Sequence, residues 1–520
     1  MGLSNRISRS KVISRFLTVL ALGGLIASCH TPLQPTVYRT HPDRNGPARG
    51  PNILLIIGDD HAGGTLGIDG DPRRATPCLD RLATQGVRFD RAFCNAPLCT
   101  PSRQTLITGR LPHATGVSRL TSKLPETETT IGDWLGDIGY DTAAYGKMHF
   151  NREDLKHGFQ DRLDVADYAR YLKSHPPKGG DHRVPWHPFK DPASVWLNAE
   201  GRSSGLPRES MDSAYFVDRA TEFFQGRIGR KEPFLMVVGL YEPHSPFKFP
   251  DGWPKVFRPE EFTVPPVSKS DLLEMPKVFA GLKPKEIQGI QAAYFTAISY
   301  VDAEIGRLVD ALDASGLAED TIVVYLGDNG YMRGDHGRFE KHCLYEPAVR
   351  VPLIFRWKGH LPEGRRVTEM VELVDVLPTL FQLSEQPAPP NLHGRSFVDP
   401  LKGKTNAKGR SVVFSEYLED EEAMVRSERY KLIVGTGSRR RQDGYDTGRP
   451  LPGPYEKLFD LQTDPGEASN LIEKPELSGI RQDLEARLLD RLAHTRNPDD
   501  QVPATLNGLQ AIHWCLRPRD

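Results

Sequence analysis

The sequence has few cysteines, almost no excess charge of either sign and no long apolar run. Six cysteines among 520 residues are too few for a small scaffold held together by disulfides. A formal net charge of −1 at pH 7 provides no basic surface for DNA or RNA, so we expect no nucleic-acid partner. No uncharged apolar stretch reaches the ~20 residues that a membrane-spanning helix needs. The remaining composition is that of an ordinary globular protein with room for several domains.

The N-terminal segment has the layout of an export signal. Basic residues without any acid precede an apolar run from Phe16 to Ala27, which ends close to Cys29, a layout typical of a secretory signal peptide. The aliphatic-small-small-Cys pattern resembles the lipobox of bacterial lipoproteins, which implies cleavage before Cys29 and attachment of lipid to it. His30 in the next position favours the outer membrane. We therefore predict a lipoprotein signal peptide over residues 1–28 and export to a bacterial envelope, with membrane contact only through the lipid anchor. An ordinary signal peptide cleaved elsewhere is the alternative.

The composition changes twice after the signal peptide. Five prolines between residues 30 and 51 predict a tether over residues 29–50. The main domain is expected over residues 51–395, and a smaller α+β domain over residues 396–510. The smaller domain is indicated by short strand-like runs at residues 411–414, 424–425 and 430–434 and by a Leu- and Arg-rich helix at residues 478–494.

Four short apolar runs in the main domain each lead into polar residues at their carboxyl ends. The runs cover residues 53–57, 140–145, 234–240 and 321–326. They continue into Gly58-Asp59-Asp60, Gly146-Lys147-Met148-His149, Tyr241-Glu242-Pro243-His244 and Gly327-Asp328-Asn329-Gly330. Helical patterns separate the runs, the clearest of them over residues 294–316, while residues 160–210 and 245–285 are expected to be long loops. We predict an α/β fold with a large, mainly parallel sheet flanked by helices, and a ligand site at the carboxyl edge of that sheet.

Two of these strand ends carry ligands for a metal ion. Asp59 and Asp60 follow one predicted strand, and Asp328 and Asn329 follow another. Carboxylates gathered at one edge repel one another unless a cation lies between them, and oxygen ligands favour a hard cation, Ca²⁺ or else Mg²⁺. The alternative is a pair of unrelated turns, because Asp and Asn are common in turns.

A longer motif decides between these alternatives. Cys99-Thr100-Pro101-Ser102-Arg103, with Thr108-Gly109-Arg110 downstream, resembles the signature of type I sulfatases in the alkaline phosphatase superfamily. The resemblance implies that a formylglycine-generating enzyme oxidises Cys99 to formylglycine (3-oxoalanine). The hydrated aldehyde is a geminal diol, and one of its hydroxyls, bound to the metal, is a better nucleophile than serine. The resemblance also assigns residues 51–395 as the catalytic domain and extends over roughly residues 50–480.

The resemblance implies a role for each polar strand end. Lys147 and His149 match a Gly-Lys-x-His segment, His244 matches Pro-His-x-Pro, and Lys341 follows a Gly-Asp-His-Gly turn. Lys147 and Lys341 are expected to bind sulfate oxygens, and His244, with Lys341, to protonate the departing alcohol. His149 is expected to take the proton of the second diol hydroxyl. The implied residues that orient the diol or hold Ca²⁺ are Arg103, Asp59, Asp60, Asp328, Asn329 and the hydroxyl derived from Cys99.

The substrate is less clear than the chemistry. The predicted loops and lipid anchor favour a sulfated carbohydrate, and Arg440, in a run of three arginines, is predicted to bind a second anionic group of it. Three alternatives stay open: a small-molecule sulfatase resembling choline sulfatases, a phosphonate monoester or phosphodiester hydrolase of the same superfamily, and a lipoprotein that binds sulfated glycans without turnover. The sequence also leaves open whether disulfides join Cys78, Cys94, Cys343 and Cys515.

Overall fold

The computed structural model describes residues 50–152, 155–177, 187–188, 196–404, 409–441 and 443–518. The predicted signal peptide, the lipidation site Cys29 and the tether up to residue 49 lie outside the described residues and stay predictions. Among the described residues, no helix is long and apolar enough to cross a membrane. Cys78, Cys94, Cys99, Cys343 and Cys515 are all free thiols.

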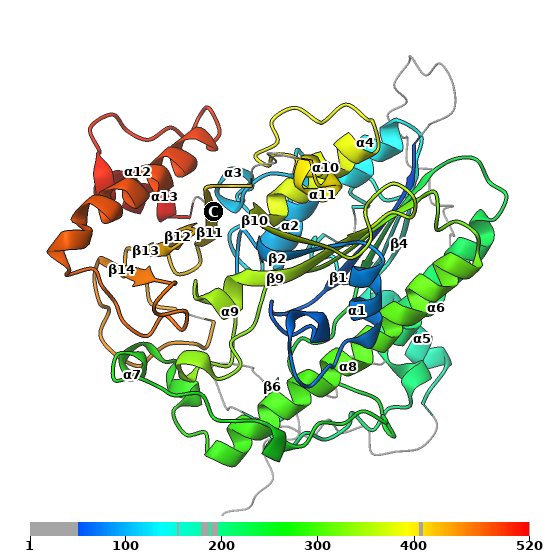
Figure 1. The fold of residues 1–520 in the computed structure, drawn as a ribbon, viewed down its shortest axis with the longest axis horizontal. Coiled ribbons are helices and arrows are strands. Elements are labelled where there is room, and N and C mark those ends of the chain that lie inside the picture. The colour runs from blue at the N-terminus through cyan, green and yellow to red at the C-terminus, as the bar shows by residue number, and fades with distance from the viewer. Residues whose placement is uncertain are drawn as a thin grey trace, which may run out of the picture. The chain divides into compact units, whose positions relative to one another are not determined.

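An eight-stranded sheet lies at the centre of the larger part of the molecule (Figure 1). Its strand order is β10-β2-β9-β8-β1-β7-β3-β4, and β9 is the one strand that runs antiparallel to its neighbours. The strands are β1 (Asn52–Gly58), β2 (Val87–Phe93), β3 (Asp141–Gly146), β4 (Asp161–Leu163), β7 (Phe234–Gly239), β8 (Thr321–Gly327), β9 (Arg350–Arg356) and β10 (Arg365–Glu372).

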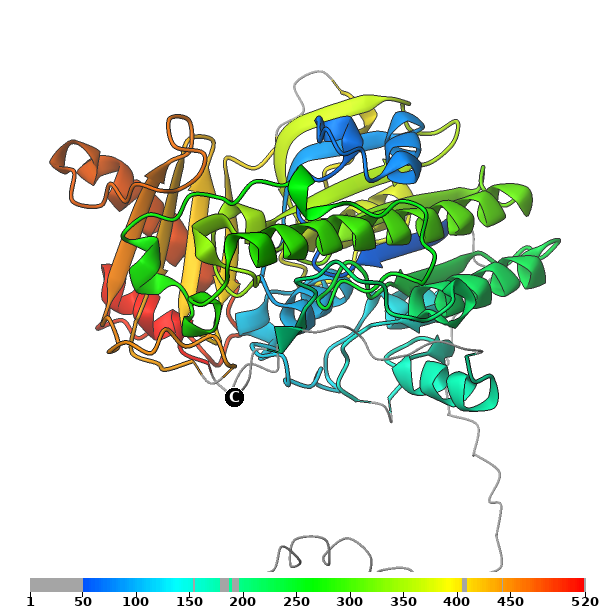
Figure 2. The same ribbon diagram turned by 90° about the horizontal axis from the view of Figure 1, so that it is seen from below.

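Helices cover both faces of this sheet because alternate side chains of each strand point to opposite faces. Leu54 and Ile56 of β1 pack on one face with α1, α6 and α8, whereas Ile53, Leu55 and Ile57 pack on the other with α2, α4 and α10. In Figure 2, α8 runs along the sheet. The helices are α1 (Pro77–Thr84), α2 (Cys99–Thr108), α3 (Pro112–Thr115), α4 (Ile131–Asp137), α5 (Val165–Ser174), α6 (Asp212–Arg227), α7 (Asp271–Glu274), α8 (Pro284–Ala314), α9 (Glu346–Val349), α10 (Val376–Leu383) and α11 (Val398–Lys402).

The C-terminal part is a four-stranded antiparallel sheet covered by two helices, coloured orange to red in Figures 1 and 2. Leu484, Leu488 and Leu492 of α12 and Ile512 of α13 pack on apolar side chains of this sheet. Its elements are β11 (Val412–Tyr417), β12 (Glu422–Ser427), β13 (Tyr430–Gly435), β14 (Tyr455–Asp460), α12 (Ser478–His494) and α13 (Gly508–Leu516). A separate two-stranded ribbon joins β5 (His187–Pro188) and β6 (Trp196–Leu197).

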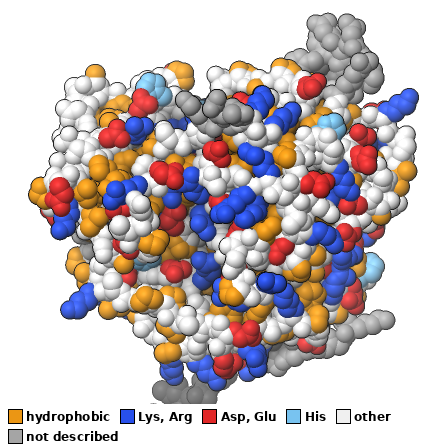
Figure 3. Space-filling view, viewed as in Figure 1, with side chains coloured by type: hydrophobic (Ala, Val, Ile, Leu, Met, Phe, Trp, Pro, Cys, Tyr) orange, Lys and Arg blue, Asp and Glu red, His pale blue; other side chains and the backbone are white. Residues whose placement is uncertain are grey.

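The predicted fold class is confirmed. The four apolar runs form four neighbouring parallel strands, β8-β1-β7-β3, and the predicted α+β pattern appears at the C-terminus. The prediction of a long loop over residues 160–210 is wrong in part, because β4 and the ten-residue helix α5 lie within it. On the face shown in Figure 3, Lys and Arg side chains are interspersed with Asp and Glu, in keeping with the net charge near zero.

A buried ion pair joins the C-terminal sheet to the larger part of the molecule. Lys431 of β13 is fully buried, and its Nζ lies 3.3 Å from Glu346 of α9 and 2.8 Å from Glu467. Lys431→Met leaves the buried Glu467 without its cation and Glu346 with only Arg426, 3.4 Å away, so we expect the free energy of unfolding to fall by about 3–5 kcal/mol. Urea unfolding measures this loss, with the exposed Lys402→Met as the control. A loss equal to that of the control would contradict the role of Lys431.

Candidate active site

The carboxyl ends of β1 and β8 bring four of the predicted residues together. The two strands pair in parallel, with Gly58 opposite Gly327, so the residues that follow each strand lie side by side. The backbone N–H of Asp60 donates to Asp328 Oδ1 at 3.1 Å, and Asn329 Nδ2 donates to Asp60 Oδ1 at 2.8 Å. Asp59, Asp328 and Asn329 are all fully buried. The predicted convergence of the two strand ends is therefore present in the structure.

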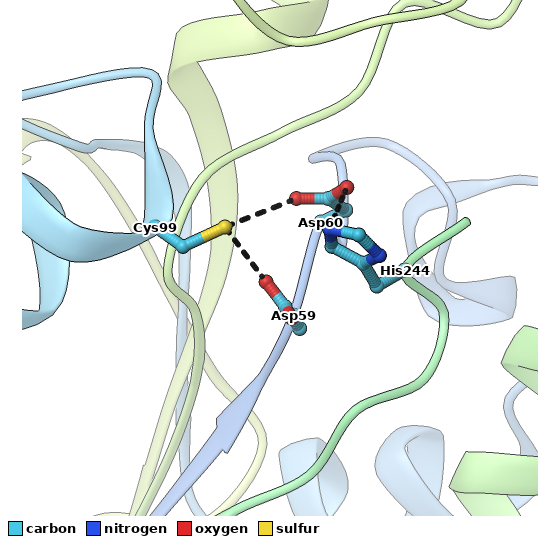
Figure 4. Close-up of side chains that lie close together, drawn as sticks. All are labelled: Asp59, Asp60, Cys99 and His244. Carbon is cyan, nitrogen blue, oxygen red and sulfur yellow. Dashed lines mark hydrogen bonds and ion pairs between the residues drawn. The ribbon is translucent and has the colours of Figure 1, made fainter. Parts of the chain in front are cut away.

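Cys99 is the first residue of α2 and points into this cluster (Figure 4). Its Sγ lies 3.2 Å from Asp59 Oδ1 and 4.0 Å from Asp60 Oδ1. His244, which follows β7, places Nε2 3.7 Å from Asp60 Oδ2 on the far side of that carboxylate. Because Cys99 begins the helix, the positive end of the helix dipole also lies at this point.

Three buried cations surround the thiol and the carboxylates. Lys341 Nζ donates to Cys99 Sγ at 2.7 Å and to Asp60 Oδ1 at 2.5 Å. Lys147, at the end of β3, lies 3.7 Å from the same sulfur and donates to Asp59. Arg103 lies one helical turn after Cys99 on the same face of α2, and its Nε donates to Asp328 Oδ2 at 2.7 Å. These contacts join the predicted metal ligands, the nucleophile and the predicted cations into one connected site.

His149 is held at the site by a hydrogen bond to Thr100 of α2. The hydroxyl of Thr100 donates its single hydrogen to the Leu120 carbonyl at 2.8 Å. Its oxygen must therefore accept the Nδ1–H of His149, 3.0 Å away. This network assigns the proton of neutral His149 to Nδ1 and leaves Nε2 as a proton acceptor. His149 and Asp60 both have positive φ, 56° and 63°, a backbone conformation that concentrates at functional sites.

Burial and mutual charge shift the pKa values of the site. Burial would raise the pKa of Asp59, but the charge of Lys147 and its cationic neighbours holds that pKa well below its usual range. Burial and the charge of Asp59 raise the pKa of Asp328 to about 7. Burial would lower the pKa of Lys341, but the neighbouring carboxylates and thiol raise it well above its usual value. Burial, with the charges of both lysines, lowers the pKa of His244 to about 4, so at pH 7 the lysines are charged and His244 is neutral.

The donor set at the two strand ends fits a hard cation. Among the described residues, Asn329 Oδ1 is a buried oxygen with no hydrogen-bond partner, whereas buried polar atoms in proteins are ordinarily satisfied. The same residue contacts two of the carboxylates: its Nδ2 donates to Asp60 Oδ1 and its backbone N–H to Asp328 Oδ1, both at 2.8 Å. One ligand atom from each of Asp59, Asp60, Cys99 and His244 also lies within 4.8 Å of the others. Oxygen ligands of this kind suit Ca²⁺ or Mg²⁺.

The unmodified thiol of Cys99 is a poor nucleophile in this setting. Burial and the charge of Asp59 raise the pKa of Cys99 to about 12, so the sulfur carries its proton at neutral pH. Because the thiolate is the reactive form of cysteine, the thiol as it stands is not activated for nucleophilic attack.

Arg440 and Arg441, neighbours in the run of three arginines, differ sharply in position. Arg440 has a half-exposed side chain paired with Asp446 at 2.9 Å. It lines a cavity of about 500 Å³ that contains none of the residues around Cys99. The prediction that Arg440 binds substrate has no support from this placement and stays a prediction. Arg441 is buried, and its guanidinium donates to Glu340 at 3.0 Å and to the carbonyl of His342 at 3.3 Å.

Arg441 therefore holds the residues on both sides of Lys341, and its loss should misplace that ammonium group. We expect Arg441→Ala to lower kcat/KM about 10- to 100-fold, since a shift of about 1 Å in a catalytic group has effects of this size. Arg440→Ala is the matched control: for a small substrate with a single anionic group, which could not reach Arg440 with a second one, it should change kcat/KM less than twofold. Steady-state kinetics at a temperature where both variants are folded checks this result. Equal effects of the two substitutions would contradict a positioning role for Arg441.

Sequence reasoning missed Arg441, Thr100, Ser102 and Tyr241. Thr100 and Ser102 lie inside the quoted motif, and Ser102 donates to the backbone carbonyl of Asp328, so the motif itself was the available signal. The ring of Tyr241 lies 4.9 Å from Lys147 Nζ, and its place directly after a predicted strand was a weaker signal. No sequence signal distinguishes Arg441 from its two neighbours.

Family models and a similar protein both match this chain over most of its length. The Sulfatase family model matches residues 51–385, and the model described as N-sulphoglucosamine sulphohydrolase, C-terminal, matches residues 334–494. An ulvan-active sulfatase of Formosa agariphila is 28% identical over 498 residues, which cover 95% of this chain and 89% of that protein.

Two solved structures show the same fold. A phosphonate monoester hydrolase of Agrobacterium radiobacter has a TM-score of 0.71 and 23% identity, covering 86% of this chain and 96% of that one. A protein in complex with its substrate, D-glucosamine-2-N,6-O-disulfate, has a TM-score of 0.62 and 21% identity, covering 86% of this chain and 98% of that one.

The family match takes in more than half of the chain and contains every residue of the connected site around Cys99. The fold of the similar structures is the large sheet with a smaller C-terminal sheet that is described above. The chain therefore belongs to the sulfatase family, in the alkaline phosphatase superfamily, and is a sulfuric ester hydrolase.

Proposed function

We propose that this enzyme removes sulfate from a sulfated saccharide, with a formylglycine made from Cys99 as the nucleophile and Ca²⁺ as the bound cation. One observation carries the proposal: two ammonium groups, of Lys341 and Lys147, lie 2.7 Å and 3.7 Å from Cys99 Sγ. An anion bound at residue 99 would contact both buried ammonium groups, and electrostatic stabilisation is strong where water is excluded. The carboxylates of Asp59 and Asp60 lie 3.2 Å and 4.0 Å from the same sulfur, so a cation held by them would lie next to residue 99.

The formylglycine and the bound cation would supply two parts of the chemistry. A formylglycine diol would provide a hydroxyl at residue 99, and a cation held by Asp59, Asp60, Asp328 and Asn329 would favour its deprotonated form. The other parts belong to the chain as it stands. Lys147 and Lys341 bind sulfate oxygens and stabilise the charge that grows on them. Arg103 donates to Asp328 and so fixes the position of that carboxylate relative to residue 99.

Proton transfer follows from the charge states of the site. Lys341 keeps its proton at neutral pH and is a proton donor for the leaving oxygen. His244 is neutral in the free site, so it becomes a donor only when the negative charge of bound sulfate raises its pKa. Neutral His149 presents Nε2 as an acceptor, which suits removal of a proton from a hydroxyl at residue 99.

The saccharide part of the proposal has support from relatives. A similar sulfatase is active on ulvan, and a structural neighbour binds a disulfated glucosamine as its substrate. We propose the same class of substrate here, in a protein exported and anchored to the outer membrane through lipid on Cys29. A formylglycine-generating enzyme is then a required partner in the cell.

Matched esters test the reaction class. The converted enzyme should hydrolyse 4-nitrophenyl sulfate with a higher kcat/KM than 4-nitrophenyl phosphate or 4-nitrophenyl phenylphosphonate, because the Sulfatase family model matches the chain over residues 51–385, which contain the whole site. Faster hydrolysis of the phosphonate would instead support the phosphonate hydrolases of this superfamily. A screen of choline sulfate against defined sulfated mono- and oligosaccharides tests the substrate, and preference for choline sulfate would contradict the saccharide proposal.

A further inference from the structure

The site opens into a cavity of about 1070 Å³ that extends well beyond the sulfate-binding lysines. Lys147, His149 and His244 form its inner part. The outer part comes from two loop segments, one after α3 and one after β3, and from a residue after β7. The outer lining residues are Leu120, Thr121, Lys123, Asn151, Arg152 and Tyr241.

The outer part of this cavity is positively charged. It contains Lys123 and Arg152, and among the described residues no acidic side chain lines the cavity. Arg152 has a carboxylate neighbour, Glu126, at 2.7 Å, but Glu126 is mostly exposed and does not line the cavity. Lys123 is exposed and has no ion pair with any described residue. A cavity with low-dielectric walls and charge of one sign attracts a ligand of the opposite sign.

The segment that carries Lys123 is tied to the catalytic helix. The carbonyl of Leu120 accepts hydrogen bonds from Thr100 of the Cys99 motif and from Asn151 Nδ2, both at 2.8 Å. Asn151 Nδ2 also donates to the carbonyl of Ser122 at 2.8 Å. The backbone next to Lys123 is therefore held relative to Cys99 before a ligand arrives, which reduces the ordering cost of binding.

The cavity walls also offer surfaces for a sugar ring. Tyr241 and the half-exposed Leu120 present apolar surface beside the two cations. An aromatic or aliphatic wall with a few polar groups is the usual form of a small-molecule site. The cavity can thus hold the body of a saccharide while its scissile sulfate lies at the inner end, beside Lys147.

From this arrangement we infer that the substrate carries a second anionic group, a sulfate or a carboxylate, and that Lys123 binds it with Arg152 beside it. This inference rests on the proposed function and narrows it to polyanionic saccharides. Lys123 is the specificity-determining residue in this assignment, because Arg152 already has a carboxylate neighbour.

Binding, measured without turnover, tests this assignment. We would use calorimetry on full-length protein with Cys99→Ala, so that no probe is hydrolysed. The probes are N-acetylglucosamine 6-O-sulfate, with one anionic group, glucosamine-2-N,6-O-disulfate, with two sulfates, and 2-O-sulfated iduronic acid, with a sulfate and a carboxylate. At least one doubly charged probe should bind about tenfold more tightly than the singly charged one, as expected for one charge-assisted contact. The probe that does so identifies the second group as sulfate or carboxylate.

Substitutions at Lys123 assign the preference to that residue. Lys123→Gln should remove the tenfold preference, and Lys123→Arg should keep most of it. Lys173→Ala, an exposed lysine of α5 outside the cavity, is the matched control and should leave the preference unchanged. Because Lys123 is exposed, the preference should also weaken as NaCl screens the charge.

Equal binding of all three probes, or a preference that Lys123→Gln leaves intact, would overturn the inference. Turnover of 4-nitrophenyl sulfate by the converted enzyme separates this failure from a failure of the proposed function. An enzyme that hydrolyses the aryl sulfate without preferring a second anion keeps the proposed function. A protein that shows the preference but no turnover keeps the binding assignment and loses the proposed function.

Discussion

Replacing Cys99 with alanine should reduce hydrolysis of 4-nitrophenyl sulfate by at least about a thousandfold, as loss of a covalent nucleophile does in other hydrolases. The reason is local, since no other described nucleophilic side chain lies between the carboxylates and the two lysines. Ser102 of the same motif is already engaged, because its hydroxyl donates to the backbone carbonyl of Asp328. Initial rates at saturating substrate check this result.

The control for Cys99→Ala is another cysteine. Cys78 is a half-buried free thiol at the start of α1, and Cys78→Ala should keep the rate of the unmutated enzyme within about twofold, as for most changes away from a site. Thermal unfolding of both variants shows whether each is folded. A folded Cys99→Ala protein that retains full activity would remove Cys99 from the mechanism.

Removing the side-chain oxygen of Asn329 should weaken Ca²⁺ binding by at least about tenfold to a hundredfold, the range seen when groups around a metal are lost. Asn329 Oδ1 is the buried oxygen without a protein partner, and Asn329→Leu replaces it with carbon at similar volume. Activity at low Ca²⁺ should fall, and a large excess of Ca²⁺ should restore it. The effect is specific to the ligand oxygen, so Asn329→Asp should keep Ca²⁺ binding.

Thermal stability provides a second measurement of this site. A cation that binds the folded state alone stabilises it by about 2.7 kcal/mol at a hundred times its dissociation constant. Ca²⁺ should therefore raise the unfolding temperature of the unmutated protein and of Asn329→Asp, and raise it much less for Asn329→Leu at the same concentration. An equal rise in all three proteins would mean that Asn329 is not a ligand.

The centre of the fold was predictable because its strands are buried on both faces. The sequences of β1, β7 and β8 are short apolar runs, as parallel strands between two layers of helices must be. By contrast, β10 lies at the sheet edge and β2 has an alternating pattern with Arg88 and Asp90 partly exposed. Their charged residues make β2 and β10 resemble loops, and Pro352 interrupts the apolar run of β9, so this side of the sheet was not predicted.

The site was predictable to the extent that its residues follow strands or belong to one motif. Asp59, Lys147 and Asp328 each follow an apolar run, and parallel packing brings those ends together whatever the loops do. Arg441 could not be predicted in this way, because neighbouring residues of an irregular loop have no periodicity that shows which one points inward. The outer cavity was hidden for the same reason, since two loops that are distant in sequence from β7 form its walls.

The chemical form of residue 99 is the central claim of this account. Mass spectrometry of the peptide that contains residue 99 measures it directly in protein produced with and without a formylglycine-generating enzyme. The account predicts a peptide lighter than the cysteine form only in the first preparation, with sulfatase activity proportional to the converted fraction. Equal sulfatase activity in a preparation whose residue 99 is entirely cysteine would contradict it.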